Sequence, residues 1–241
     1  MKYAILSDVH ANPADLEFVL QDIHAQGAEK IVFCGDITGY GYDAKGALAI
    51  VRRETDVQLK GNHDEVCVDA DPPPWVRMNP NYDLDRAAQG QLDAEELAWL
   101  KSRPYVWATP VLACVHGDFT EPEAFNYVMS ASDARLQFYV RPERLLFVGH
   151  THTACSYSLD SMGRVEYHSP QTFELRRGCR YLVNVGSAGY PRNDGYLTYC
   201  LFDAKARKVE FRGAAFNPES YDRAMRGRGL KTPDWVLRAI S

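Results

Sequence analysis

The first sixty residues alternate short apolar runs with segments in which apolar residues recur at helical spacing. Tyr3–Leu6 is too short for a helix and suits a buried strand, and Lys30–Cys34 and Val57–Leu59 have the same character. Pro13–Gln26 and Ala44–Arg53 have the spacing of helices, and a proline suits the first turn of the earlier one. This β-α-β-α-β order predicts a parallel sheet with right-handed crossovers.

Between residues 66 and 110 this alternation stops. Pro72–Pro74 argue against regular structure, whereas Leu84–Lys101 is typical of one or two helices. We therefore expect a single domain over residues 1–241, in which residues 66–110 form a mostly helical, cap-like insertion and residues 214–241 a helical C-terminal tail. The helices expected in the tail are Pro218–Arg226 and Pro233–Ile240.

Strand patterns resume after the insertion. Val111–Val115 and Leu145–Val148 are short apolar runs that suit buried strands. The stretch from Ala154 to Gly213 is almost wholly β-like, which predicts antiparallel neighbours that form a second sheet. The strands expected there are Ala154–Leu159, Arg164–His168, Phe173–Arg177, Tyr181–Val185, Tyr196–Phe202 and Lys208–Arg212.

Composition and charge narrow the class of protein. The chain has 241 residues, of which 46% are hydrophobic and 24% charged, as in an ordinary globular protein. A net charge of −5 argues against a nucleic-acid partner, because phosphate-backbone binders normally present a basic face. No apolar run approaches the roughly 18 residues of a membrane span. The first residues, MKYAILS, lead directly into Asp8 and therefore resemble a first strand and not a signal peptide. These features favour a cytoplasmic protein without a membrane partner.

The six cysteines do not form a metal-binding or disulfide pattern. None of them falls in a C-x-x-C pair. Their number and spacing in a chain of this length argue against a disulfide framework and against a thiolate metal site.

Polar residues of similar chemistry follow five of the predicted strands. Ligand sites in open α/β sheets lie outside the carboxyl ends of strands, so these residues are candidates for one site. Each of them alone could instead cap a helix, form a turn or lie in a solvated loop. Together they use five of the seven histidines and leave over His24 and His168. The five clusters are SDVHAN with Asp8 and His10, CGDITGYG with Asp36, KGNHDE with Asn62, His63 and Asp64, CVHGD with His116, and VGHTHT with His150 and His152.

This set of side chains points to metal binding. Seven ligands exceed what one tetrahedral ion uses, and two ions that share one carboxylate would use them all. Mixed imidazole and carboxylate ligation favours Mn, Fe, Zn, Co or Ni over Ca or Mg. Two-metal sites hold their ions about 3.5–4 Å apart and clamp the attacking and leaving oxygens of a phosphoryl displacement. The oxygen ligands would be Asp8, Asp36 and Asn62, and the nitrogen ligands His10, His116, His150 and His152.

The order D-x-H, G-D, G-N-H-[DE], H, G-H-x-H resembles the calcineurin-like metallophosphoesterase family. Gly186–Asp194 (GSAGYPRND) also resembles a segment of the small bacterial and archaeal members. The resemblance implies an α/β fold, a four-layer α/β/β/α sandwich of two mixed β-sheets flanked by helices. The matching blocks are Asp8-x-His10, Gly35-Asp36, Gly61-Asn62-His63-Asp64, His116 and Gly149-His150-x-His152.

The resemblance also implies a role for each matching residue. Asp8, His10 and His152 would hold one metal ion, Asn62, His116 and His150 the other, and Asp36 would bridge the two. His63 would contact the phosphate or protonate the leaving oxygen. Asp64 would orient and polarise the imidazole of His63, because a histidine with a carboxylate partner is a competent general acid.

The reaction implied is hydrolysis of a small phosphomonoester or phosphodiester, nucleotide-type substrates included. A metal-bridging hydroxide would attack, since metal binding lowers the pKa of water from 15.7 to about 7 in favourable sites. The cofactors would be two divalent transition-metal ions, with manganese the ion of choice in assays.

Some features depart from the family pattern. The glycine common after D-x-H is Ala11, and GDITGYG lacks the arginine of the G-D-x-x-D-R-G block, which argues against protein-phosphatase activity. Arg192 is a candidate phosphate contact in its place, with a solvated loop arginine as the alternative. The insertion holds Trp75, Tyr82, Trp99, Tyr105 and Trp107, which suit packing, or alternatively a lid that stacks on a nucleobase.

Two other functions compete with the phosphoesterase. One is a non-catalytic metal-binding scaffold for protein interaction, the role of the retromer subunit with this fold, and the intact His63 and Asp64 argue against it. The other is a nuclease, which the acidic balance disfavours.

Overall fold

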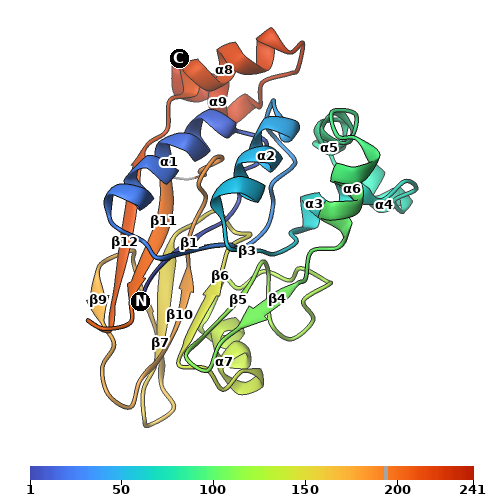
Figure 1. Cartoon of the computed structure of the whole chain (residues 1–241). Coiled ribbons are helices and arrows are strands. Elements are labelled where there is room, and N and C mark those ends of the chain that lie inside the picture. Colours follow the sequence, from blue (N-terminus) through green and yellow to red (C-terminus); the bar gives the residue numbers. More distant parts are fainter. Residues whose placement is uncertain (193–194) are drawn as a thin grey trace.

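Two six-stranded β-sheets lie face to face, and helices cover their outer faces (Figure 1). The computed structural model describes residues 1–192 and 195–241. Buried apolar residues fill three layers, one between the sheets and one between each sheet and its helices. The expected four-layer α/β/β/α sandwich of two mixed sheets is therefore confirmed.

The first sheet combines strands from both ends of the chain, in the order β3-β2-β1-β11-β12-β9. Strands β1, β2 and β3 are parallel, as the β-α-β-α-β pattern predicts, whereas β11, β12 and β9 add antiparallel pairs. The strands are β1 (Lys2–Leu6), β2 (Lys30–Phe33), β3 (Val57–Gln58), β9 (Phe173–Glu174), β11 (Tyr196–Asp203) and β12 (Lys208–Ala215).

The second sheet has the order β4-β5-β6-β10-β7-β8. Strands β5, β6 and β10 are parallel, and β4, β7 and β8 extend the sheet through antiparallel pairs. The strands are β4 (Val106–Ala108), β5 (Leu112–Val115), β6 (Leu145–Val148), β7 (Cys155–Leu159), β8 (Val165–His168) and β10 (Arg180–Asn184).

The strands between residues 154 and 213 divide between the two sheets, so the prediction that they form one second sheet is wrong. Strands β7, β8 and β10 join the second sheet, while β9, β11 and β12 join the first. Strand β11 pairs along the edge of β1, with Ile5 opposite Cys200. The alternation of apolar residues shows which face of a strand is buried, but it does not identify the strand that pairs with each edge.

Helices α1 and α2 cover the first sheet, and α7 covers the second. The side chain of Asn12 accepts a hydrogen bond from the Asp15 N–H at the start of α1, and four apolar residues at helical spacing face the core. The sequence pattern missed α7, in which Ala134, Gln137 and Phe138 are the buried residues, and the three-residue strand β4. These helices are α1 (Pro13–Ala25), α2 (Ala44–Glu54) and α7 (Ala131–Val140).

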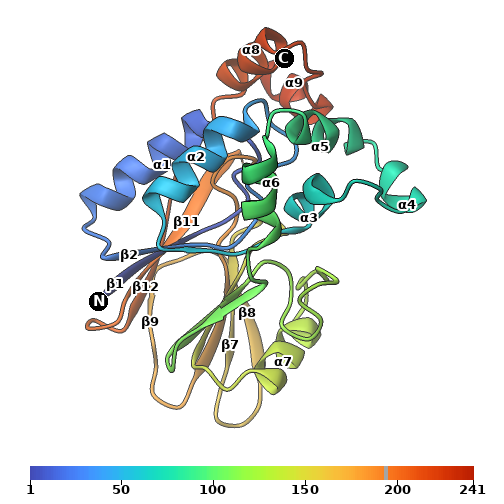
Figure 2. The ribbon, with the colours of Figure 1, turned by 45° about the vertical axis from the view of Figure 1, so that its right-hand side comes forward.

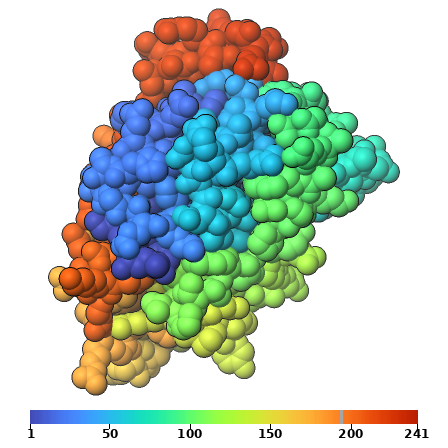
Figure 3. Space-filling view, viewed as in Figure 1, coloured from blue at the N-terminus to red at the C-terminus, as the bar shows by residue number. Residues whose placement is uncertain are grey.

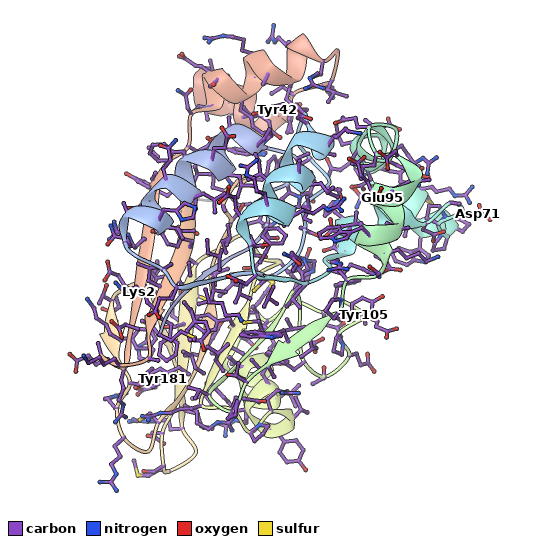
Figure 4. The ribbon with its side chains drawn as sticks, in the orientation of Figure 1. Lys2, Tyr42, Asp71, Glu95, Tyr105 and Tyr181 are labelled. Atoms are coloured by element: carbon purple, nitrogen blue, oxygen red, sulfur yellow. The ribbon has the colours of Figure 1, made fainter. Side chains whose placement is uncertain are left out.

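The remaining helices project from the sandwich at one side and at one end (Figure 2, Figure 3). Helices α4 to α6 lie within residues 66–110. The sequence argued against regular structure at Pro72–Pro74, but Pro74 is the first residue of α4, so that expectation is wrong for Pro74. Asp71 and Glu95 lie on this projecting part, and Tyr42 lies near α8 of the tail (Figure 4). The helices are α3 (Asn62–Val68), α4 (Pro74–Arg77), α5 (Tyr82–Gln89), α6 (Ala94–Lys101), α8 (Pro218–Gly227) and α9 (Asp234–Ile240).

All six cysteines are free thiols, and five of them are buried, where a thiol acts as a small apolar side chain. None of the helices in the described part of the chain is long and apolar enough to cross a membrane.

Candidate metal centre

All seven predicted ligands come together at one edge of the two sheets. Six of them lie just beyond the carboxyl ends of β1, β2, β5 and β6, and Asn62 begins α3 after β3. Asn62 is half-buried and the other six side chains are buried. Strands from both sheets therefore contribute to one centre.

The first group of ligands comprises Asp8, His10, Asp36 and His152, whose ligand atoms all lie within 4.8 Å of one another. His10 Nε2 lies 3.0 Å from His152 Nε2, and Asp8 Oδ1 lies 3.2 Å from His152 Nε2. Asp36 Oδ2 lies 3.6 Å from His10 Nε2. This spacing suits a cation held in the middle of the group.

The second group comprises Asp36, His116 and His150. His116 Nε2 lies 3.3 Å from Asp36 Oδ2 and 3.2 Å from His150 Nδ1. Asn62 Oδ1 lies 3.1 Å from His116 Nε2 and completes the group. Asp36 belongs to both groups, as a bridging ligand would.

Hydrogen bonds to carbonyl oxygens fix the imidazole tautomers. His10 Nδ1 donates to Thr38 O at 2.9 Å, and His152 Nδ1 donates to Tyr190 O at 2.7 Å. A carbonyl oxygen only accepts, so in the neutral rings both Nε2 atoms carry lone pairs, and these face each other across 3.0 Å. At protein metal sites the other ring nitrogen of a metal-binding histidine usually donates to a carbonyl or carboxylate oxygen in this way.

Two carboxylate oxygens lack hydrogen-bond donors. Asp8 Oδ1 and Asp36 Oδ2 are buried atoms without a hydrogen-bond partner among the described residues, and both face imidazole nitrogens. An uncompensated buried carboxylate oxygen is costly. Divalent cations would compensate both oxygens and the opposed lone pairs, so the residues present fit a metal centre of mixed nitrogen and oxygen ligands.

Burial and charge set the protonation of the imidazoles. Burial lowers the pKa of His10 to about 4 and that of His150 to about 3, so both rings are neutral near pH 7, the form that binds a metal ion. Burial also acts to lower the pKa of His116, but the carboxylates of Asp36 and Asp8 outweigh it and raise this pKa to about 10. Binding of a cation at this group would therefore compete with protonation of His116.

The backbone is strained where the ligands attach. Five ligand residues adopt left-handed φ angles between 49° and 67°, a region that non-glycine residues seldom occupy. Hydrogen bonds such as His10 N–H to Asp36 O and His150 N–H to Asp8 Oδ2, both 3.0 Å, hold this conformation. The five residues are Asp8, His10, Asp36, His150 and His152.

Two motif glycines allow the loops to approach closely. A Cβ atom on Gly61 would overlap the Asp36 carboxylate, and one on Gly149 would lie 2.5 Å from Asp8 Oδ2. Any larger residue would displace a ligand.

The segment Gly186–Asp194 supports the centre from behind, although Asn193 and Asp194 lie outside the described residues. Ser187 Oγ donates to Asp8 O at 2.7 Å, and Tyr190 O accepts the bond from His152. Arg192 is exposed and lines a neighbouring cleft.

The partner of His63 differs from the one that the resemblance implies. His63 Nδ1 lies 2.6 Å from Asp85 Oδ1, and both side chains are buried. The Asp64 carboxylate instead accepts backbone N–H bonds from Asp36, Ile37, Thr38 and Gly61 at 2.9–3.1 Å. His63 and Asp64 are successive residues in the first turn of α3, where successive side chains point about 100° apart. Asp64 therefore positions the Asp36 loop and does not bond to His63.

Asp85 is a residue that sequence reasoning missed. It lies on α5 in the insertion, and no motif marks it. Burial acts to lower the pKa of His63, but the carboxylates of Asp85 and Asp36 outweigh it and raise this pKa to about 9.

Two of the insertion's aromatic side chains pack against the apolar core, and a third is exposed. Trp99 and Trp107 pack partly buried against the apolar core, and Trp75 is exposed on α4. The insertion residues that line the neighbouring cleft are Pro80, Asn81, Asp83 and Leu84, none of which is aromatic. Packing is therefore the better interpretation of Trp99 and Trp107.

Comparisons with known proteins agree with this geometry. The crystal structure of a metallophosphoesterase from Sphaerobacter thermophilus is 31% identical, with a TM-score of 0.84 over 98% of this chain and 97% of that one. An uncharacterized protein of Methanocaldococcus jannaschii is 27% identical over 240 residues, 97% of this chain and 94% of its own. A hypothetical protein from Pyrococcus horikoshii shares the fold, with a TM-score of 0.75 at 16% identity over 98% and 96% of the two chains.

The model of the calcineurin-like phosphoesterase superfamily domain matches residues 1–207, most of the chain. The seven candidate ligands and all strands of the two sheets except β12 lie within these residues. The chain therefore belongs to the calcineurin-like phosphoesterase superfamily.

Proposed function

We propose that this chain is a dinuclear-metal-dependent phosphoesterase that hydrolyses a small phosphomonoester or phosphodiester. The observation that carries the proposal is the pair of buried ligand groups that share Asp36. The family and the Sphaerobacter thermophilus metallophosphoesterase support the reaction class.

Each ligand group would hold one ion, with Asp36 common to both. The mixture of imidazole and carboxylate suits Mn, Fe, Zn, Co or Ni. When bound, the ions would supply positive charge to the phosphoryl group and lower the pKa of water towards neutrality. The first ion would have Asp8, His10, Asp36 and His152 as ligands, and the second Asp36, Asn62, His116 and His150.

His63 is the proposed proton donor to the leaving oxygen. Its ring lies 5.0 Å from that of His10 between centroids, beside the first ligand group. Because Asp85 occupies Nδ1, His63 Nε2 is the nitrogen available to a substrate. Asp85 holds the ring in this orientation and favours the protonated form that a general acid needs.

Arg192 is the proposed contact for substrate phosphate. Its guanidinium lies close enough to Tyr40 and Tyr190 to lower the pKa of both phenols, against the larger opposite effect of burial. Tyr40 in turn contacts His10 and His63. A planar guanidinium suits a phosphate group because it can donate two parallel hydrogen bonds.

The proposal is tested by hydrolysis of p-nitrophenyl phosphate and its bis ester. Protein is stripped with a chelator and reconstituted with Mn²⁺, and wild type is compared with Asp36→Asn and with Glu17→Gln, an exposed acid away from the centre. We expect Asp36→Asn to lose more than about 100-fold in rate, because residues that merely support ligands typically contribute about 10- to 100-fold. Equal trace rates in wild type and Asp36→Asn would end the proposal.

A further inference from the structure

A cleft of about 1010 Å³ lies between the helical insertion, Arg192 and the C-terminal tail. The insertion contributes Pro80, Asn81, Asp83 and Leu84, and the tail contributes residues 229–235 and Arg238. Figure 2 shows the tail and α5 near each other at this end of the molecule. Two parts of the chain outside the sheets therefore enclose a space large enough for a small organic molecule.

The floor of the cleft lies beside the candidate metal centre. Tyr40 and Tyr190 line the cleft and stack on each other with 4.4 Å between ring centroids. The Tyr40 ring lies 4.5 Å from the ring of His63 and 4.6 Å from that of His10. The cleft therefore borders the side chains of the centre.

The tail is attached to this floor. The Trp235 indole N–H donates to the Tyr190 hydroxyl at 2.5 Å, and the Tyr221 hydroxyl donates to Tyr40 O at 2.9 Å. Met225 and Val236 of the tail belong to the apolar core of the first sheet. The tail wall of the cleft is thus held in place.

Three cations line the cleft without carboxylate partners among residues 1–192 and 195–241. Arg192, Lys231 and Arg238 are exposed, and none of them forms an ion pair with another described residue. Asp83 and Asp234 also line the cleft, so three positive and two negative side chains leave a net charge of +1, on a chain whose net charge is −5. Unpaired cations gathered in a concave site attract anions.

We propose that this cleft binds a second phosphate group on the substrate while the scissile phosphoester lies at the metal centre. Guanidinium forks match phosphate oxygens, and Lys231 adds a point charge. The two carboxylates oppose a long polyphosphate, so the cleft suits a single additional phosphate on an organic spacer. This inference rests on the proposed function for the position of the scissile group, but binding in the cleft can be measured without it.

The first experiment measures binding to the chelator-treated protein without metal. Pyrophosphate, as a probe, is titrated by calorimetry into wild type, into the Lys231→Ala/Arg238→Ala variant, and into a Lys205→Ala/Arg223→Ala variant that removes the same charge at exposed positions outside the cleft. We expect the cleft variant to raise the Kd by about tenfold or more and the control variant to match wild type. No binding to wild type, or equal loss in both variants, overturns the proposal.

The second experiment compares butyl phosphate with butane-1,4-diyl bisphosphate as substrates of the Mn²⁺-loaded enzyme. In wild type, kcat/KM for the bisphosphate should exceed kcat/KM for butyl phosphate by about tenfold or more. The ratio of these two values should fall towards one in Lys231→Ala/Arg238→Ala but not in the control variant. The same ratio in wild type and the cleft variant overturns the proposal. If wild type hydrolyses neither ester, the proposed function fails while pyrophosphate binding still decides on the cleft.

Discussion

His63 Nδ1 donates a hydrogen bond to Asp85 Oδ1 at 2.6 Å, and this bond joins α3 at the candidate metal centre to α5 in the insertion. Both side chains are buried, so solvent does not compete for the bond. A Cβ atom on Gly39 would lie 2.8 Å from the His63 ring, and this glycine therefore leaves room for the imidazole. The insertion thus supplies the carboxylate that orients His63.

Replacing Asp85 should affect substrates with poor leaving groups most. Asp85→Asn keeps an acceptor near His63 but removes the negative charge that favours the protonated ring. If His63 donates a proton to the leaving oxygen, kcat for alkyl phosphates should fall by about 100-fold, within the range typical of general acid catalysis. The fall for p-nitrophenyl phosphate should be smaller because that leaving group needs little protonation.

The measurement is kcat across a series of aryl and alkyl phosphates. Glu95→Gln, an exposed substitution on α6, serves as the control and should follow wild type throughout. A uniform fall across the series would show that Asp85 acts through general structure and not through His63.

Adding one methyl group at Gly61 should weaken metal binding. The new Cβ would overlap the Asp36 carboxylate, which is shared by both ligand groups, and would force that side chain to move. We expect Gly61→Ala to lower Mn²⁺ affinity by about 10- to 100-fold, as for other changes that disturb ligand orientation. Equilibrium dialysis compares it with Gly227→Ala, which adds the same group in open space at the end of α8. Wild-type affinity in Gly61→Ala would mean that the loop accommodates the methyl group.

Metal removal should destabilise the folded chain. Without a cation, Asp8 Oδ1 and Asp36 Oδ2 have no hydrogen-bond partner among the described residues and face only imidazole nitrogens, at 3.2–3.7 Å. At about 100 times Kd, an ion that binds the native state alone stabilises it by about 2.7 kcal/mol, which corresponds to a rise in Tm of roughly 5–10 °C for a chain of this size. Differential scanning calorimetry with Mn²⁺ and with chelator measures this shift, and a shift of equal size in Asp36→Asn would speak against binding at this centre.

The Asp22–Arg212 pair should give a pH-dependent contribution to stability away from the centre. Arg212 Nε and Nη2 lie 2.8 and 3.0 Å from the two Asp22 oxygens, and this bond lowers the pKa of Asp22 to about 2. Because the folded pKa lies below the unfolded value, the stabilisation is present above about pH 4 and is lost as the pH falls towards 2.

Asp22→Asn therefore has a small, pH-dependent cost. The side chains are 34% and 28% exposed, so we expect the free energy of unfolding to fall by no more than about 1 kcal/mol at neutral pH. Urea denaturation at about pH 6 and about pH 3 tests the sign, since the difference between variant and wild type should shrink at the lower pH. A difference that grows at low pH contradicts the assignment.

The candidate metal ligands could be predicted from sequence because each lies within four residues of the end of a strand. The strand end is visible as a short apolar run, and the ligand follows it directly, as His150 and His152 follow Leu145–Val148. The parallel order of β1, β2 and β3 follows from their helical crossovers in the same local way.

The features that escaped prediction depend on contacts between distant parts of the chain. Asp85 meets His63 only because α5 folds back on α3, and Trp235 meets Tyr190 only because the tail packs on the first sheet. The pairing of β11 with β1 likewise joins residues about two hundred positions apart. Local spacing carries no information on such contacts.

The number of metal ions bound per chain tests the central claim most directly. Chelator-stripped protein is dialysed to equilibrium against Mn²⁺ and its metal content is measured by mass spectrometry, for wild type and for His10→Ala and His116→Ala variants that keep the wild-type circular dichroism spectrum. Because His10 belongs to one ligand group and His116 to the other, we expect two ions in wild type and one in each variant. A single ion in wild type, or two ions retained in either variant, would contradict a dinuclear centre that shares Asp36.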